Sequence, residues 1–451
     1  MFQVLAASWP LLLGVMFLMV GNGVQGTLLG IRGGIEGFST FQMSLVMSAY
    51  FLGFLFGSRM TPIMIRRVGH VRVFAALGSL ISAVLVLYPV LVQWESWIVL
   101  RVLIGFSFSG VYITAESWLN NSATNETRGQ SLSLYMMMQM IGIVTAQGLL
   151  NLASPSGFTL FVIPSVLVSL AFTPILLSIA PAPVFDTTKP LSFRDLYRIS
   201  PLGCIGVFLL GGVFSALFGM ASVWGTQQGL SVREITIFVG TIYVGGMLFQ
   251  YPIGWASDRM DRRRLIVGST AVGAVVSVAA AFLSLPFVAL LGVALVVGGI
   301  SNPLYSLLIA YTNDYLEKED MPAASAGLIF INGMGAILGP VVTGWIMSKM
   351  GPGGFFLFIG ILMAVMSGYA IWRMTRRAST PVSDTGAFAA VIPSASALAV
   401  DAVFEAAVEE AEEASDEAHE AQEAHEADLA GRAEDHAEDR AEDRTEERAD
   451  A

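Results

Sequence analysis

The sequence predicts an all-α polytopic membrane protein with twelve transmembrane helices, and three observations support this prediction. First, the 451-residue chain is 55% hydrophobic and 13% charged, with a mean hydropathy of +0.68. Soluble globular proteins of this length are much more polar. Second, twelve apolar runs are each long enough to cross the roughly 30 Å hydrocarbon layer of a bilayer. Third, the first six runs and the last six share an internal repeat.

The twelve apolar runs define the predicted elements. They cover residues 6–29, 40–60, 72–93, 97–119, 130–152, 158–180, 200–224, 235–255, 264–285, 287–311, 323–348 and 354–374. The first run lacks a basic leading segment and is too long for the core of a signal peptide, so we expect it to be a true membrane span. An even number of spans places both termini on the same side of the membrane.

The loop charges predict which side that is. The loops and chain ends on one side of the membrane carry fifteen Lys or Arg residues. The loops on the other side carry only Arg32, Arg233 and Lys349. Loops rich in Lys and Arg stay on the cytoplasmic side. We therefore expect both termini to be cytoplasmic, with the lipid bilayer as an obligatory partner.

The internal repeat divides the membrane part into two halves. A shift of 193 positions places Tyr50 on Tyr243, Tyr112 on Tyr305, Gln139 on Asn332 and Gly142 on Gly335. We expect two pseudo-symmetric six-helix bundles at residues 1–180 and 200–375, joined by a cytoplasmic central loop at 181–199. A twelve-span protein of another fold is the alternative.

Residues 376–451 form a tail of different composition. Residues 1–378 hold 20 Lys and Arg against 13 Asp and Glu, whereas residues 379–451 hold 4 against 22. A segment so acidic and so poor in large apolar residues cannot bury a core, so we expect a largely disordered cytoplasmic tail. The tail is either a dispensable extension or a docking site for a cytoplasmic partner.

A short polar loop carries the clearest motif of the chain. It reads Gly254-Trp-Ala-Ser-Asp258-Arg259-Met-Asp261-Arg262-Arg263-Arg264 and separates two apolar runs. It resembles the loop motif of the major facilitator superfamily, which lies between spans 2 and 3 and often again between spans 8 and 9. The resemblance covers residues 1 to about 375 and implies two six-span halves that work by alternating access.

A second stretch narrows the resemblance. The junction of spans 4 and 5 reads Ala115-Glu116-Ser-Trp118-Leu-Asn120, then Ala123-Thr-Asn125-Glu126-Thr-Arg128-Gly129, which is similar to the YcaD-like bacterial branch of that superfamily. This branch implies a bacterial inner (plasma) membrane location. The first-half loop departs from the motif, because Ile65 or Arg66 stands where an aspartate is expected. The span-5 Gly-Pro motif of drug/proton antiporters is also missing, which argues against drug export.

Charged side chains near the predicted cytoplasmic ends suggest a latch between conformational states. The resemblance implies that loop arginines meet acidic residues of span 4, here Arg66 or Arg67 with Glu116. The second-half counterpart is Asp314 with Arg259 or Arg262, beside Asp258. Glu116 has an alternative role, because a buried carboxylate can take up and release a proton. Arg101 either holds an anionic group or neutralises a proton site, or else snorkels to the outer interface.

Neutral polar residues near the membrane midplane are the candidates for a substrate cavity. Gln139 and Asn332 lie about ten residues into spans 5 and 11, roughly 15 Å deep at 1.5 Å per residue. They are repeat mates, and transporter sites lie near the midplane between repeats. The remaining candidates are Asn22, Gln25, Tyr112 and Tyr305.

These features together predict a secondary transporter for a small organic solute, with proton coupling through Glu116 as one alternative. We expect a monomer and no enzymatic activity, since the sequence contains no catalytic pattern, phosphate-binding loop or metal-ligand spacing. No cofactor, metal or nucleic-acid partner is expected. Two other functions stay open: a non-transporting scaffold or receptor that acts through its acidic tail, and a lipid-handling protein of the same fold.

Overall fold

The computed structural model describes residues 2–122, 125–176, 191–377, 381, 385–386, 388–391, 395–396, 399–400, 402–409 and 425. Its contacts divide the chain into two compact units, Met1–Phe404 and Glu405–Ala451. The fold described below is that of the first unit, Met1–Phe404. Most of the acidic tail and residues 181–190 of the predicted central loop lie outside the described residues.

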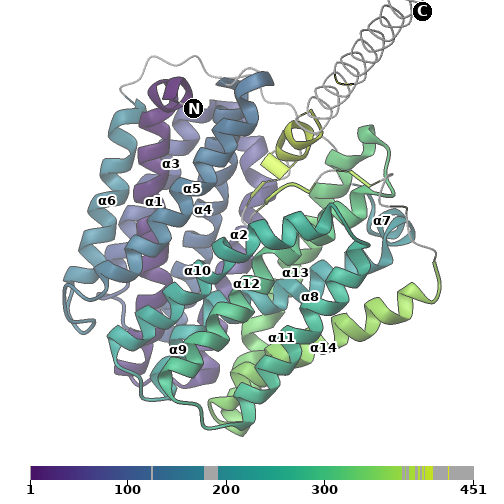
Figure 1. The fold of residues 1–451 in the computed structure, drawn as a ribbon. Helices are drawn as coiled ribbons and strands as arrows, with labels where there is room; N and C mark the ends of the chain where they lie inside the picture. Colours follow the sequence, from purple (N-terminus) through teal and green to yellow (C-terminus); the bar gives the residue numbers. More distant parts are fainter. Residues whose placement is uncertain are drawn as a thin grey trace, which may run out of the picture. The chain divides into compact units, whose positions relative to one another are not determined.

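The described part of the first unit is helical (Figure 1). The first half contains α1 (Phe2–Ile35), α2 (Thr40–Val68), α3 (His70–Leu87), α4 (Trp94–Ser122), α5 (Asn125–Leu149) and α6 (Thr159–Leu176). The second half contains α7 (Phe193–Ile199), α8 (Pro201–Ser215), the π-helical turn η1 (Ala216–Met220), α9 (Ala221–Gln227), α10 (Val232–Ser257), α11 (Arg262–Phe282), α12 (Phe287–Asn313), the 3₁₀ turn η2 (Lys318–Asp320), α13 (Met321–Met350) and α14 (Gly353–Met374).

The helices account for the predicted spans. Eleven helical segments within the described residues are long and apolar enough to cross a membrane, with α8, η1 and α9 forming one continuous segment, Pro201–Gln227. The sixth predicted span corresponds to a shorter apolar helix, Thr159–Thr173. The all-helical membrane fold predicted from hydropathy is therefore confirmed.

The two halves repeat the same helix packing. In the first half α2 packs against α4 and α1 against α5, and in the second half α10 packs against α12 and α8 against α13. Glycines permit the closest crossings: a Cβ atom built on Gly105 would lie 1.9 Å from the Tyr50 carbonyl oxygen. A Cβ atom on its repeat mate Gly298 would lie 2.2 Å from the Ile242 oxygen. Small residues at equivalent positions thus set equivalent crossings.

The halves also contact each other directly at one end of the bundle. There the Ser48 hydroxyl of α2 donates to the Ile337 carbonyl of α13 at 2.5 Å, and Asn151 donates to the Thr236 hydroxyl at 3.1 Å. A Cβ atom on Gly30 of α1 would lie 2.1 Å from the Ser222 hydroxyl of α9. We call this the packed end. The opposite end, which carries the α2–α3 and α10–α11 loops, is the arginine-rich end.

Candidate functional site

A central cavity of about 170 Å³ lies between the two halves. Helices α1, α2, α4 and α5 of the first half contribute to its wall, as do α8, η1, α10, α12 and α13 of the second half. Its lining residues are Asn22, Tyr50, Phe51, Phe54, Leu55, Ser58, Tyr112, Gln139, Met140, Ile143, Phe214, Phe218, Tyr243, Asn302, Ile329, Asn332, Gly333 and Ala336. Two pairs of repeat mates, Tyr50 with Tyr243 and Gln139 with Asn332, therefore line the same space.

The polar part of the cavity wall consists of amides and hydroxyls. Asn22 donates to the Tyr112 hydroxyl at 2.9 Å, and Asn332 donates to the Val207 carbonyl at 2.9 Å. The Nε2 atom of Gln139 is buried and has no hydrogen-bond partner among the described residues. An unsatisfied buried donor is unfavourable unless it meets a ligand or water. Gln139 is thus the cavity-lining residue whose amide nitrogen has an unused hydrogen-bonding capacity.

The apolar part of the wall is mainly aromatic. The Phe218 ring lies 4.6 Å from the Tyr243 ring and 5.5 Å from the Phe214 ring, measured between centroids. Phe218 belongs to the π-helical turn η1, which interrupts the α-helical path between α8 and α9. Such turns occur often at functional sites because they change which side chains face inward. Aromatic faces and amides together suit a solute that has both a ring and hydrogen-bonding groups.

A buried arginine supports one side of the cavity. Arg101 is 3% exposed and donates to Gln25 at 2.6 Å, while its guanidinium lies 4.9 Å from the centroid of the Tyr50 ring. Gln25 in turn donates to Asn22 at 3.1 Å, and Asn22 reaches Tyr112. Neither Gln25 nor Arg101 lines the cavity. This chain of hydrogen bonds fixes the orientation of the Asn22 amide at the cavity wall.

Glu116 is fully buried on α4. It accepts hydrogen bonds from the Tyr135 hydroxyl at 2.9 Å and from the backbone N–H of Ser396 at 2.8 Å. Arg66 and Arg67, its expected partners, lie in the last turn of α2, and both are exposed. The contact with Ser396 was not expected from the sequence, because it joins residues 280 positions apart.

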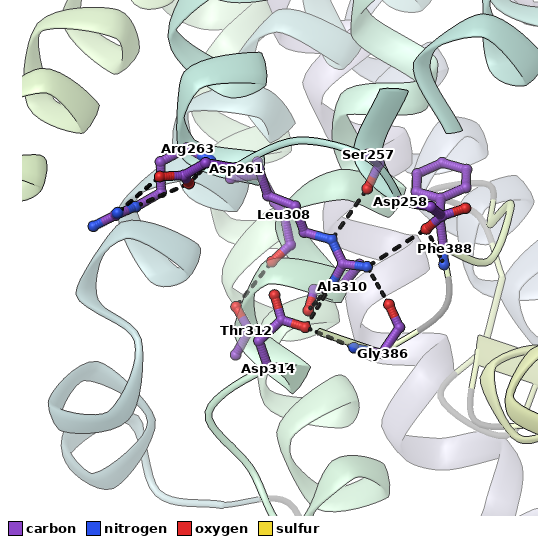
Figure 2. Close-up of polar contacts among 11 residues, drawn as sticks. Ser257, Asp258, Asp261, Arg263, Leu308, Ala310, Thr312, Asp314, Gly386 and Phe388 are labelled. Atoms are coloured by element: carbon purple, nitrogen blue, oxygen red, sulfur yellow. Dashed lines mark hydrogen bonds and ion pairs between the residues drawn. The ribbon is translucent and has the colours of Figure 1, made fainter. Parts of the chain in front are cut away.

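The second-half charge cluster surrounds Arg262, whose side chain is 2% exposed. Figure 2 labels the acidic residues Asp258 and Asp314 of this cluster. Its guanidinium pairs with Asp314 at 2.5 Å and more weakly with Asp258 at 3.8 Å, and it donates to the Ala310 carbonyl at 3.1 Å. Burial raises the pKa of Asp314, while the Arg262 charge opposes that rise. Arg259 does not join the cluster: it is exposed and donates to the Trp255 carbonyl at 3.3 Å.

Asp261 has a different role in this loop. It caps the start of α11 by accepting from the Arg263 backbone N–H at 2.9 Å, and it also pairs with the Arg263 side chain at 2.8 Å. Burial acts to raise the pKa of Asp261, but the bonds from Arg263 outweigh it and hold that pKa below its usual value. The two acidic residues of the loop motif thus have different roles: Asp261 caps a helix, whereas Asp258 pairs with Arg262.

The predicted cavity residues separate into two groups. Asn22, Tyr112, Gln139 and Asn332 line the cavity, whereas Gln25 stands behind Asn22. Tyr305 is fully buried away from the lining. Asn302 takes the α12 position at the cavity, three residues earlier on the same face of the helix. Sequence reasoning missed Asn302, although an amide inside an apolar span was the available signal.

Comparisons with known proteins agree with this architecture. The sequence profile described as Major Facilitator Superfamily matches residues 11–242 and 203–409. A protein of Salmonella arizonae named "Uncharacterized MFS-type transporter YcaD" is 25% identical over 378 residues, which cover 82% of this chain and 96% of that protein. The Escherichia coli O6:K15:H31 protein of the same name is 26% identical over 380 residues, with 82% and 96% covered.

Solved structures share the fold at low identity. A mutant of the nucleoside transporter NupG superimposes with a TM-score of 0.71 at 14% identity, covering 81% of this chain and 99% of that one. A bacterial homolog of the human lysosomal transporter Spinster, in an inward-facing and unoccupied conformation, gives a TM-score of 0.62 at 14% identity, covering 89% and 97%. With its two helical halves, its central cavity and its match to the family profile, the chain belongs to the Major Facilitator Superfamily of membrane transporters.

Proposed function

We propose that this transporter moves a small, neutral organic solute across the membrane by alternating access through the central cavity. The observation that carries the proposal is the cavity wall, to which both halves contribute repeat mates at equivalent positions. A site shared between two repeats is exposed to one side or the other when the halves rock about it. Direct contacts at the packed end support a state that is closed on that side.

The chemistry of the wall supports a neutral solute. Within the described part of the chain, the cavity lining contains amides, hydroxyls, aromatic rings and aliphatic groups but no Asp, Glu, Lys or Arg. A charged solute would lose its hydration there without gaining an opposite charge. A ring with polar substituents would stack on Phe218 or Tyr243 and bond to Gln139. Nucleosides, named for the fold relative NupG, belong to this chemical class and are suitable first ligands.

Glu116 has two alternative roles, proton coupling and the latch, and one substitution distinguishes them. In this state Glu116 accepts hydrogen bonds from Tyr135 and Ser396, an arrangement compatible with either role. Under proton coupling, Glu116→Gln abolishes uphill transport but preserves solute exchange, because exchange needs no net proton movement. Under the latch role, the same substitution changes the rates of uphill transport and exchange together.

A ligand screen tests the proposed substrate class. Purified protein is heated with neutral ring-containing metabolites and with charged ones, and the melting temperature is recorded for wild type and Gln139→Leu. A neutral ligand present at 100 times its Kd should stabilise the wild type by about 2.7 kcal/mol and the variant by less. Stabilisation by anionic or cationic compounds alone would refute a neutral solute. Equal shifts in both proteins would show that the ligand makes no hydrogen bond to Gln139.

We further propose that the arginine-rich end faces the cytoplasm, as the loop charges predict. A cysteine introduced at exposed Arg67 in a Cys204→Ser protein tests this orientation. An impermeant thiol reagent should label it in inverted membrane vesicles and not in intact cells. Labelling in intact cells would reverse the orientation.

A further inference from the structure

A segment beyond the last helix packs against the arginine-rich end of the bundle. We define the plug segment as the described residues between Gly386 and Phe404. Several of its side chains are buried, among them Val391 at 2% exposure and Val400 at 0%. Composition alone placed these residues in a solvated tail, but their contacts place them in the same compact unit as the transmembrane helices.

The start of the plug segment binds the loop-motif cluster (Figure 2). Arg262 donates to the Gly386 carbonyl, and the Gly386 N–H donates to Asp314 at 3.2 Å. The Phe388 N–H donates to Asp258 at 2.9 Å. A Cβ atom built on Gly254 would lie 2.7 Å from the Phe388 ring, so the motif glycine leaves room for that side chain. The charges of the cluster thus bind main-chain groups of the segment as well as each other.

Two residues in the middle of the plug segment bond to different halves of the bundle. Val391 exchanges two hydrogen bonds with the Ser306 side chain of α12: its N–H donates at 2.9 Å, and its carbonyl accepts at 3.0 Å. Ser396 then donates its N–H to Glu116 of α4 at 2.8 Å. The segment therefore bonds to α12 of one half and α4 of the other.

These anchor points lie directly beyond the cavity. Ser306 is four residues from the cavity residue Asn302 on α12, and Glu116 is four residues from the cavity residue Tyr112 on α4. Four residues correspond to about 6 Å along a helix and return to the same face. The plug segment consequently spans the two halves about one helical turn from the cavity, toward the arginine-rich end.

We infer that the plug segment is a built-in ligand of the arginine-rich end, which occupies this mouth of the cavity and must leave before a solute can pass. A segment bonded to both halves also resists their relative movement, so its release controls the conformational change. This inference rests on the proposed transport function, because a plug matters only if a solute passes through the cavity. Its test measures access to the cavity and requires no identified substrate.

Two neighbouring residues provide a matched pair of variants. Val391 is buried, whereas Ala390 beside it is exposed. In a Cys204→Ser protein, Ser58→Cys places a single thiol in the cavity wall. The labelling rate by a cationic methanethiosulfonate reagent is then measured on this full-length parent protein and on its Val391→Asp, Asp258→Ala and Ala390→Asp variants. Melting temperatures of all four proteins establish that the bundle stays folded.

Loss of the plug should expose the thiol. Because one hydrogen bond to a charged group can shift an equilibrium about tenfold, Asp258→Ala should raise the labelling rate about tenfold. Val391→Asp should raise it at least as much, and Ala390→Asp should leave it unchanged. Deletion of residues 405–451 should also leave it unchanged, because the plug segment ends at Phe404.

The result that would overturn the inference is equal labelling of the parent, Asp258→Ala and Val391→Asp proteins. If the plug variants label faster but no neutral solute stabilises the protein, the gating inference stands and the proposed substrate class fails. If a solute binds but labelling does not respond to the plug variants, the transport proposal stands and the gating inference fails.

Discussion

At the scale of single residues, the site depends on neutral hydrogen-bonding groups held in place by buried charge. Arg101 has no carboxylate partner among its described contacts and instead bonds to Gln25, which orients Asn22. A buried cation of this kind is unfavourable unless it is hydrogen-bonded. Two of its guanidinium nitrogens bond to Gln25 and Met47, while Nε has no partner among the described residues. Its charge stays behind the cavity wall, so the described lining presents amides, hydroxyls and rings but no charged side chain.

The repeat mates Tyr112 and Tyr305 supply a test at this scale. Tyr112→Phe removes the hydroxyl that accepts from Asn22, so it should weaken solute binding by about fivefold, the effect of one neutral hydrogen bond of about 1 kcal/mol. Tyr305→Phe should leave binding unchanged, because Tyr305 does not line the cavity. Isothermal titration with the screened solute measures both. Equal weakening by the two variants would show that Tyr112 has no special role.

Arg262 contributes to the stability of the folded protein as well as binding the plug segment. Arg262→Ala leaves Asp314, 4% exposed, without its ion-pair partner and should lower the unfolding free energy by about 3 kcal/mol. Arg262→Ala with Asp314→Ala together should recover part of that loss, because no unpaired buried charge remains. Arg259→Ala is the control, since its side chain is exposed. Chemical denaturation in detergent measures all four proteins, and an Arg262→Ala protein as stable as the control would refute the pairing.

At the scale of elements, helix crossings are set by glycine at a few positions. Gly298 and Gly292 both lie on α12, but only Gly298 meets a neighbouring helix, at the Ile242 carbonyl. The crossing of α10 and α12 therefore depends on glycine at Gly298, as it does at Gly245 on the facing helix, where a Cβ atom would lie 2.2 Å from the Leu295 carbonyl oxygen. Because the Asn302 position follows on the same helix, a shift of this crossing would also disturb the cavity.

Substitution of these two glycines tests the crossing. Gly298→Ala should lower the melting temperature and the yield of folded protein, because its Cβ would lie 2.2 Å from a backbone oxygen that cannot rotate away. Gly292→Ala should be neutral or slightly stabilising, since a Cβ there meets no atom within 4 Å and alanine favours helix. Thermal unfolding followed by tryptophan fluorescence compares the two. A Gly292→Ala protein that melts as low as Gly298→Ala would contradict this account.

Elements were the features most readily predicted from sequence. Hydropathy located the spans because the membrane requires about twenty apolar residues per helix. It underestimated helix length, since α2 continues to Val68 where the predicted run ends at residue 60. A repeat offset predicted Gln139 and Asn332 together at one cavity. The repeat offset could not predict that Asn302 lines the cavity and Tyr305 does not. The rotation of α12 about its own axis, which decides this, is set by packing against neighbouring helices.

At the scale of the whole molecule, membership of a transporter family confirms the prediction that the chain is a transporter and not an enzyme. The two halves are joined by different means at the two ends of the bundle. Direct hydrogen bonds join them at the packed end, while the plug segment bonds to both α4 and α12 at the other. Local sequence gave no sign of the plug, because its partners are 72 to 280 residues away and few of its side chains are large.

The central claim is that transport requires the two halves to separate at the packed end. The most direct measurement is solute flux into proteoliposomes by a Cys204→Ser protein carrying Asn151→Cys and Thr236→Cys, whose native side chains are joined by a 3.1 Å hydrogen bond. A disulfide or a short thiol cross-linker should join the halves. We predict that the cross-linked protein transports no solute, that reducing the disulfide restores the flux, and that each single-cysteine protein is unaffected by oxidation. Full flux through a completely cross-linked protein would contradict alternating access at this cavity.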